Sequence, residues 1–274
     1  MNLRLVASDL DGTLLSGDSR LAPRTIEALQ QTAAQGVEVV AVTGRSHRTC
    51  VELLRPAECI RWAICSNGAT VWDFEAEDVV VRRPLDNGQV VGVLAAVEQA
   101  FPTAGLSWET GTGHYVTEQW ITARRAVDPR FRNRLDLPPV TFDFDHGEVL
   151  KLMLAHDELI TFDWLDALRP HLSDDLSIST SGATFVEVTR ADANKGDALA
   201  DLCRMLGIGP EATVAFGDHA NDLPMLAWAG RSYAMANADD SVLAVADAVA
   251  PPHHEDGVAQ VLEGLLGGGS SAAG

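Results

Sequence analysis

Two aspartates stand two residues apart near the start of the chain, Asp9 and Asp11, in the run Ser8-Asp9-Leu10-Asp11-Gly12-Thr13. The apolar segment Leu3–Ala7 before them predicts a buried parallel strand, which places both acids at its carboxyl end, where open α/β sheets keep their ligand sites. Two carboxylates in one polar cleft repel each other unless a cation or hydrogen bonds offset their charge. Hard oxygen ligands of this kind favour Mg²⁺.

This pair of acids has two other interpretations. An EF-hand loop counted from Asp9 requires Gly at its sixth position and Glu at its twelfth, whereas this chain has Leu14 and Arg20 there, so calcium binding of that kind is excluded. Ordinary turn chemistry stays open for the pair taken alone, because Asp and Gly are common turn residues.

Three further polar features follow in order along the chain and decide between these interpretations. Thr43-Gly44 comes after the apolar run Val37–Val42, Lys195 lies near the start of a later helix, and the segment 217–222 reads Gly-Asp-His-Ala-Asn-Asp. Together the four features supply a nucleophile, an acid/base, a hydroxyl donor, a fixed cation and metal ligands. Phosphoryl transfer needs this set, because positioning and charge neutralisation provide most of its catalysis.

The order and local sequence of these motifs resemble the haloacid dehalogenase superfamily, and specifically its Cof-like phosphatases, over the chain to about Leu266. The resemblance implies that Asp9 attacks phosphorus and that Asp11 serves as general acid and base. It implies substrate-binding roles for Leu10, Thr43, Gly44, Lys195 and Asn221, with Lys195 also restraining Asp9. It also implies an Mg²⁺ cofactor on the carboxylates of Asp9 and Asp218 and the backbone carbonyl of Asp11, with Asp222 supporting Lys195 or the metal.

The amino-acid composition and net charge limit the classes of partner that the protein is expected to bind. Its 274 residues, 46% of them hydrophobic and 22% charged, are typical of a globular protein large enough for a core with an inserted module. The net charge of −19 repels nucleic acid and anionic membranes, so neither is expected as a partner. We expect a small phosphorylated substrate and a monomer or homodimer.

Four scattered cysteines without C-x-x-C spacing indicate buried thiols in a reducing compartment. The chain enters its first strand without a signal-peptide pattern and has no apolar stretch of membrane-spanning length. We therefore expect a cytoplasmic protein. The Gly/Ser/Ala-rich segment 267–274 is expected to be a disordered tail.

The alternation of buried strands and helices predicts an α/β fold, a doubly wound, mostly parallel sheet with a Rossmann-like core. Core elements are expected at 1–83 and again at 187–266. Residues 84–186 lack this regular alternation of buried strands and helices. They are expected to form an inserted α+β cap domain that ends in a hairpin around Ser181-Gly182-Ala183. Because Lys195 must sit beside Asp9, the segment between them has to leave the core and return.

Several other conspicuous residues are assigned mainly to structure rather than to catalysis. The segment 207–212 has the letters of a dinucleotide fingerprint, but it follows a helix, so a helix end and loop are favoured. His253 and His254 are assigned to a solvated loop rather than a metal site. Trp108 and Trp120 are assigned to packing, and Arg124 and Arg125 to a solvated face, with substrate contact left open for all four. His219 is given no chemistry, and Asn67 is a candidate substrate contact.

The pattern therefore predicts a phosphoric monoester hydrolase that uses Mg²⁺ and an aspartyl-phosphate intermediate. A phosphotransferase of the phosphomutase type is the first alternative, and mutase activity on a hexose phosphate would distinguish it. A non-catalytic sensor of phosphorylated ligands is the second, and the intact pair of Asp9 and Asp11 argues against it, because a sensor has no need of a general acid. Sugar phosphates, pyridoxal phosphate and flavin or nucleotide monophosphates all remain open as substrates.

Overall fold

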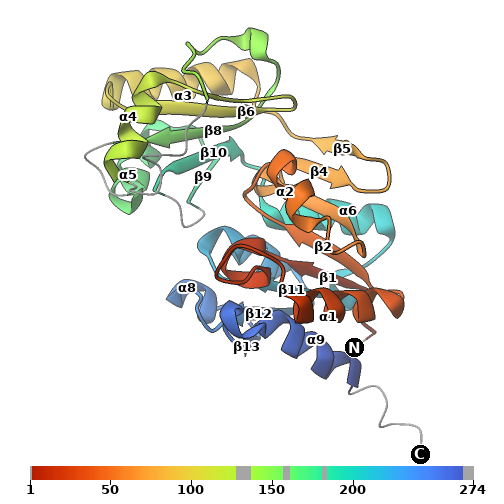
Figure 1. The fold of residues 1–274 in the computed structure, drawn as a ribbon. Coiled ribbons are helices and arrows are strands. Elements are labelled where there is room, and N and C mark those ends of the chain that lie inside the picture. The colour runs from red at the N-terminus through yellow and green to blue at the C-terminus, as the bar shows by residue number, and fades with distance from the viewer. Residues whose placement is uncertain (1, 128–136, 157–160, 181–183, 268–274) are drawn as a thin grey trace, which may run out of the picture. The chain divides into compact units, whose positions relative to one another are not determined.

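The computed structural model describes residues 2–127, 137–156, 161–180 and 184–267. The chain divides into two compact units, one formed by Met1–Val81 with Lys195–Gly274 and the other by Arg82–Asn194. Figure 1 colours the chain from red to blue, and the first unit accordingly combines the red and orange elements with the cyan and blue ones. Two distant parts of the sequence thus build a single unit.

An eight-stranded sheet forms the centre of the first unit, in the order β13-β12-β11-β1-β2-β3-β4-β5. Its neighbours from β13 to β3 pair in parallel, and β4 pairs antiparallel with β3. The strands are β1 (Leu5–Ser8), β2 (Glu38–Val42), β3 (Ile60–Cys65), β4 (Thr70–Asp73), β5 (Asp78–Arg82), β11 (Thr213–Gly217), β12 (Arg231–Met235) and β13 (Ala248–Ala250). Every residue of β1 and β11 is buried, as a parallel strand covered on both faces requires.

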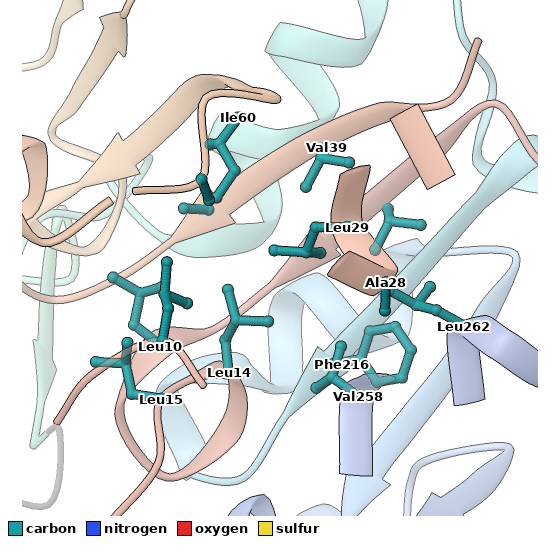
Figure 2. Close-up of a cluster of buried hydrophobic side chains, with 14 of the residues drawn as sticks. Leu10, Leu14, Leu15, Ala28, Leu29, Val39, Ile60, Phe216, Val258 and Leu262 are labelled. Carbon is teal, nitrogen blue, oxygen red and sulfur yellow. The ribbon is translucent and has the colours of Figure 1, made fainter. Parts of the chain in front are cut away.

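Helices cover both faces of this sheet. On one face lie α1 (Pro23–Ala34), α2 (His47–Leu54) and α9 (Gly257–Gly267), which share a hydrophobic core with Phe216 of β11. Figure 2 shows this core, in which Leu10, Leu14 and Leu15 lie together with side chains of α1 and α9. The other face carries α6 (Lys195–Leu206), α7 (Leu223–Trp228) and the short α8 (Asp240–Leu243) over a second core.

The second unit has its own antiparallel sheet in the order β7-β6-β8-β10-β9. These strands are β6 (Gly105–Thr110), β7 (His114–Val116), β8 (Val149–Ala155), β9 (Leu176–Ser179) and β10 (Val186–Arg190). The helices are α3 (Asn87–Ala100), α4 (Glu118–Val127) and α5 (Thr161–Leu168). A capping box between Asp86 and Gln89 starts α3, whose valines pack with α5 on one face of the sheet, while α4 packs on the other.

The fold class expected from the sequence is confirmed, since the large sheet is mostly parallel with helices on both faces and the separate antiparallel sheet fits a cap domain. The second unit, Arg82–Asn194, is longer than the expected segment 84–186. At its C-terminal end it is longer because β10 pairs with β8 and β9 as far as Arg190. The turn at 181–183 and the tail at 268–274 lie outside the described residues. Within the described ranges no helix has both the length and the apolar character that a membrane crossing requires.

Candidate active site

The turn after β1 presents Asp9 and Asp11 because its leucines are anchored in the core. Leu10 and Leu14 are buried in the hydrophobic cluster of Figure 2, and the backbone between them forms a single wide turn of the π type. Gly12 in this turn has φ +83°, and a Cβ atom there would lie 2.2 Å from Asp218 Oδ2. Glycine is therefore required at this position, both for its backbone conformation and for its close approach to a second acidic loop.

The candidate nucleophile, Asp9, is bound by Lys195, the lysine predicted from the sequence to restrain it. Lys195 Nζ lies 2.6 Å from Asp9 Oδ1 and 2.6 Å from Asp222 Oδ1, and all three side chains are buried. Burial opposes the charge on Lys195, but its contacts with Asp222 and Asp9 outweigh this effect and raise the pKa of the amine. Lys195 is therefore a permanent cation between two carboxylates.

Close packing of α6 on α7 places this lysine. Lys195 is the first residue of α6, and a Cβ atom on the following Gly196 would lie 2.5 Å from the carbonyl oxygen of Pro224 in α7. Glycine at 196 thus lets the start of α6 approach the loop that carries Asp222. The position of the lysine and that of its second carboxylate partner are set by the same contact.

The loop after β11 supplies two more buried carboxylates, Asp218 and Asp222. The Oδ2 atom of Asp222 accepts hydrogen bonds from the backbone N–H groups of Asp218 (2.9 Å) and His219 (3.0 Å). The hydroxyl of Thr13 donates to Asp218 Oδ1 at 2.9 Å and links this loop to the turn after β1. Asp222 thus supports Lys195, which is one of the two roles implied by the resemblance.

Asp9, Asp218 and Asp222 form an acidic cluster in which one carboxylate oxygen of each residue lies within 4.8 Å of the other two, so they could hold a metal ion. Burial, with a smaller contribution from Asp222, raises the pKa of Asp218 to about 6. Burial likewise raises the pKa of Asp9 well above its ordinary value, Lys195 acts in the opposite direction, and Asp222 and Asp218 add to the rise. Carboxylates that resist ionisation in this way fit a divalent cation, which would offset their repulsion.

This cluster contains both predicted carboxylate ligands, Asp9 and Asp218, and adds Asp222. The side chain of Asp11 is not part of it. The Asp11 carboxylate instead forms an ion pair with Arg45, with distances of 2.7 Å from Nε to Oδ2 and 2.5 Å from Nη2 to Oδ1. A role for the backbone carbonyl of Asp11 as a metal ligand stays a prediction.

Thr43 and Gly44 follow β2, the strand next to β1. The hydroxyl of Thr43 is buried and accepts a hydrogen bond from the backbone N–H of Arg45 at 3.1 Å, which leaves its own hydrogen to donate. Leu10, another predicted substrate contact, buries its side chain completely in the core, so only its backbone could reach a ligand. The sequence did not distinguish side chain from backbone at this position.

Asn221 is joined to Asn67, the residue proposed as a substrate contact. The Asn221 Nδ2 atom donates to Asn67 Oδ1 at 3.1 Å, and Asn67 adopts the left-handed conformation with φ +58°. The amide oxygen of Asn221 is buried without a hydrogen-bond partner among the described residues. A buried polar atom of this kind loses free energy unless a ligand or water satisfies it, so Asn221 fits a binding role.

Three contributors to this region were missed by the sequence analysis. Arg45 could have been found, because it directly follows Thr43-Gly44 in a strongly acidic chain. Asn237 donates to the carbonyl oxygen of Gly12 at 2.8 Å, and His253 Nδ1 lies 2.8 Å from the carbonyl oxygen of Leu15. These two residues hold the backbone of the turn after β1. The assignment to a solvated loop fits His254, which is exposed, but not His253, which is half-buried against the turn. No local pattern indicated the role of Asn237.

The residues that were assigned mainly to structure lie in both units. His219 Nδ1 lies 3.0 Å from Asp239 Oδ2; burial lowers the pKa of this imidazole, but Asp239 and Asp218 outweigh that effect and raise it. Trp108 and Trp120 are buried in the two cores of the second unit.

The assignment of Arg124 to a solvated face is wrong, because its guanidinium is buried over the ring of Phe185. Its neighbour on α4, Arg125, is exposed.

A doubly wound sheet with clustered carboxylates and a buried lysine beyond the carboxyl ends of its strands is typical of a Rossmann-like enzyme that transfers phosphoryl groups. A family model described as haloacid dehalogenase-like hydrolase matches residues 6–262, and the chain belongs to this family.

Relatives and solved structures agree with this assignment. The chain is 30% identical to the pyridoxal phosphate phosphatase YbhA of Escherichia coli (strain K12), over 96% of this chain and 98% of the relative. It is 29% identical to the 5-amino-6-(5-phospho-D-ribitylamino)uracil phosphatase YcsE of Bacillus subtilis (strain 168), over 96% and 95%. The structure of the subclass IIB sugar phosphatase BT4131 matches with a TM-score of 0.80 and 25% identity, over 96% and 98%. The predicted family and enzyme class, a phosphoric monoester hydrolase, are confirmed at this level.

Proposed function

We propose that this protein is a Mg²⁺-dependent phosphatase that hydrolyses small phosphorylated metabolites through an aspartyl-phosphate on Asp9. The observation that carries the proposal is the buried Asp9 carboxylate, which Lys195 binds at Oδ1 over 2.6 Å. A carboxylate fixed through one oxygen has its other oxygen directed for attack, and the ion pair restricts its rotation.

The acidic cluster supports the choice of cofactor. The carboxylates of Asp9 and Asp218 would hold Mg²⁺, with the backbone carbonyl of Asp11 as a further ligand. When bound, the ion neutralises charge on the phosphoryl oxygens and offsets the repulsion between the carboxylates. Asp222 is already engaged by Lys195 and by two backbone N–H groups, so we assign it to support rather than to direct ligation.

The reaction proceeds in two steps. In the first, an Asp9 carboxylate oxygen forms a bond to phosphorus while the bond from phosphorus to the ester oxygen breaks, and Asp11 gives its proton to that leaving oxygen. In the second, a water oxygen forms a bond to phosphorus, its proton passes to Asp11, and the bond between Asp9 and phosphorus breaks. Inorganic phosphate and free Asp9 result.

Donors around Asp9 are suited to the phosphoryl oxygens. Lys195 provides a fixed positive charge, and Thr43 has a hydroxyl hydrogen that its own contacts leave available to donate. The backbone N–H of Gly44 and the amide of Asn221 would complete the set. Such preorganised donors stabilise the charge that develops in the transition state.

We further propose that the second unit serves as the cap that selects the leaving group and excludes water during the reaction. Its own antiparallel sheet and hydrophobic cores support an independent body joined to the first unit by two crossings. A cytoplasmic location is proposed from the four free cysteines, which suit a reducing compartment.

The test is phosphate release by the purified protein with Mg²⁺ from a panel of monoesters. The panel contains pyridoxal 5′-phosphate and 5-amino-6-(5-phospho-D-ribitylamino)uracil, which appear in the names of two relatives above. Hexose 6-phosphates are added as examples of sugar phosphates, the class named for the third. Asp9→Asn is the matched control, because it preserves shape and removes the nucleophile. We expect it to lower turnover by several orders of magnitude. Retention of more than about a tenth of the wild-type rate, which is about 1.4 kcal/mol of barrier, would refute Asp9 as the nucleophile.

The same assay separates hydrolysis from the phosphomutase alternative. A phosphatase releases inorganic phosphate in proportion to the ester consumed. An isomerised hexose phosphate with little free phosphate would instead identify a phosphotransferase and overturn the proposed hydrolysis.

A further inference from the structure

The Asp11 carboxylate is held by a two-point ion pair. Arg45 donates from Nε to Asp11 Oδ2 and from Nη2 to Asp11 Oδ1, at 2.7 Å and 2.5 Å. A planar guanidinium that meets both oxygens of a carboxylate fixes its plane as well as its distance. The orientation of Asp11 is therefore set by a residue 34 positions later in the chain.

Arg45 is itself fixed to the turn after β2. Its backbone N–H donates to Thr43 Oγ1 at 3.1 Å, and its carbonyl oxygen accepts from the backbone N–H of Ser66 at 2.8 Å. The hydrogen bond to Asp11 is the main cause that raises the pKa of Arg45, so the guanidinium stays charged. Because these two hydrogen bonds fix the backbone at residue 45, the Arg45 side chain can hold Asp11 in one orientation.

Asp11 is held by fewer contacts than the neighbouring acids. Its side chain is 47% exposed, and Arg45 is its sole side-chain partner among the described residues. The neighbouring acids Asp9 and Asp218 differ, since both are buried and are bound by Lys195 and Thr13 respectively. Without Arg45, the Asp11 carboxylate could rotate into solvent, away from the ester oxygen that it has to protonate.

We propose that Arg45 is a positioning residue that acts on the reaction through Asp11. The inference rests on the proposed function, in which Asp11 donates a proton as the ester bond breaks and accepts one from water afterwards. The two-point ion pair is that of ionised Asp11, the form that accepts the proton from water. When Asp11 carries the proton that it gives to the ester oxygen, its other oxygen still accepts from Arg45. Both transfers require the carboxyl group within hydrogen-bond reach of the reacting oxygen, so loss of its orientation reduces both. Arg45 touches neither phosphorus nor the ester oxygen in this scheme.

A double-mutant cycle between the two residues tests this dependence. The variants are Arg45→Met, Arg45→Lys, Asp11→Asn and the combination of Asp11→Asn with Arg45→Met. The measured quantity is kcat/KM for p-nitrophenyl phosphate and for the alkyl phosphate of the panel that turns over fastest. An aryl leaving group departs without a proton, whereas an alkoxide needs one, so the alkyl ester reports the general acid selectively.

We expect Arg45→Met to lower kcat/KM for the alkyl ester about 10- to 100-fold and for the aryl ester by less than about threefold. Arg45→Lys should recover part of the alkyl loss, because it keeps the charge but not the two-point geometry. The double variant should lie within about threefold of Asp11→Asn alone, since residues that act as a unit are not additive. Arg55→Gln, which changes an exposed arginine at the C-terminal end of α2, is the matched control and should change neither ester.

Two results would overturn the proposal. Additive losses in the double variant, equal for both esters, would show that Arg45 binds the substrate phosphate directly. Equal losses together with a lower melting temperature of Arg45→Lys would show a purely structural role. Neither result affects the proposed function, which fails separately if the wild type releases no phosphate or if Asp9→Asn remains active.

Discussion

Replacing Asp218 by Asn should stabilise the metal-free protein at neutral pH. The substitution removes one of three clustered negative charges, and the amide oxygen of the new side chain can still accept the hydrogen bond from Thr13. Asp218 is buried and its pKa is raised to about 6, against an ordinary value of 3.8. Ionising it inside the folded protein therefore costs stability, and the difference corresponds to at most about 3 kcal/mol of free energy of unfolding.

The sign of the pH dependence follows from the direction of the shift. A raised pKa means that the folded protein binds this proton more tightly than the unfolded chain does, so the wild type loses stability as pH rises between about 4 and 6. Asp218→Asn lacks this loss. The advantage of the variant should be largest at pH 7.5 and should shrink towards zero near pH 4.

Thermal unfolding in EDTA across this pH range measures the effect. Since about 1 kcal/mol moves the melting temperature by roughly 2–4 °C in a domain of this size, we expect the variant to melt up to roughly 6–12 °C higher at pH 7.5. Glu58→Gln, an exposed carboxylate in the same unit, is the control and should change little. Mg²⁺ at 1,000 times its Kd should reverse the order, because it adds about 4.1 kcal/mol to the wild type alone, which exceeds the advantage of about 3 kcal/mol expected for the variant.

A variant that melts below the wild type in EDTA at pH 7.5 would refute this reasoning, as would a difference that does not depend on pH. Either result would mean that the acidic cluster is satisfied by its own hydrogen bonds and places no demand on a cation.

Further outcomes concern the metal, the lysine and the turn after β1. Chelation should silence turnover, and Mg²⁺ should restore it while Ca²⁺ does so poorly, because Ca²⁺ prefers more ligands and longer bonds; full activity in excess chelator would contradict the metal assignment. Lys195→Met should lower the free energy of unfolding by about 3–5 kcal/mol, since it leaves Asp9 and Asp222 buried without their cation, and an unchanged denaturant midpoint would argue against this. Asn237→Ala should cost about 1 kcal/mol of stability and also lower turnover, because it releases the Gly12 carbonyl; unchanged turnover would show that the turn needs no such support.

The order of elements and the family could be predicted from the amino-acid sequence alone. Apolar runs that end in polar residues are local signals, and β1, β2, β3 and β11 each lie within a few residues of the expected strands. Gly207 ends α6 with a positive φ, as expected for a helix C-terminus. The pairing of Lys195 with Asp9 was also expected, because the chemistry of the motifs required it, although the roles of both residues remain proposals.

The limits of the second unit were predicted less well. Val186 to Arg190 had been divided between cap and core, whereas the antiparallel partners of this strand place all of it in the second sheet. Strand pairing decides which sheet a short apolar segment joins, and a single strand does not reveal its partners. The buried Arg124 was misjudged for the same reason, since the ring of Phe185 that covers it lies in another part of the chain.

The support of the acids depends on tertiary contacts that no local pattern contains. The sheet places β1 between β11 and β2, so the turns that follow these strands meet at one edge and bring Asp218 beside Gly12 and Arg45 beside Asp11. Asn237 and His253 reach the turn after β1 through the same closure of the chain. Such contacts depend on which strands are neighbours and on distances of a few ångströms between residues far apart in sequence, and local patterns of residue type specify neither.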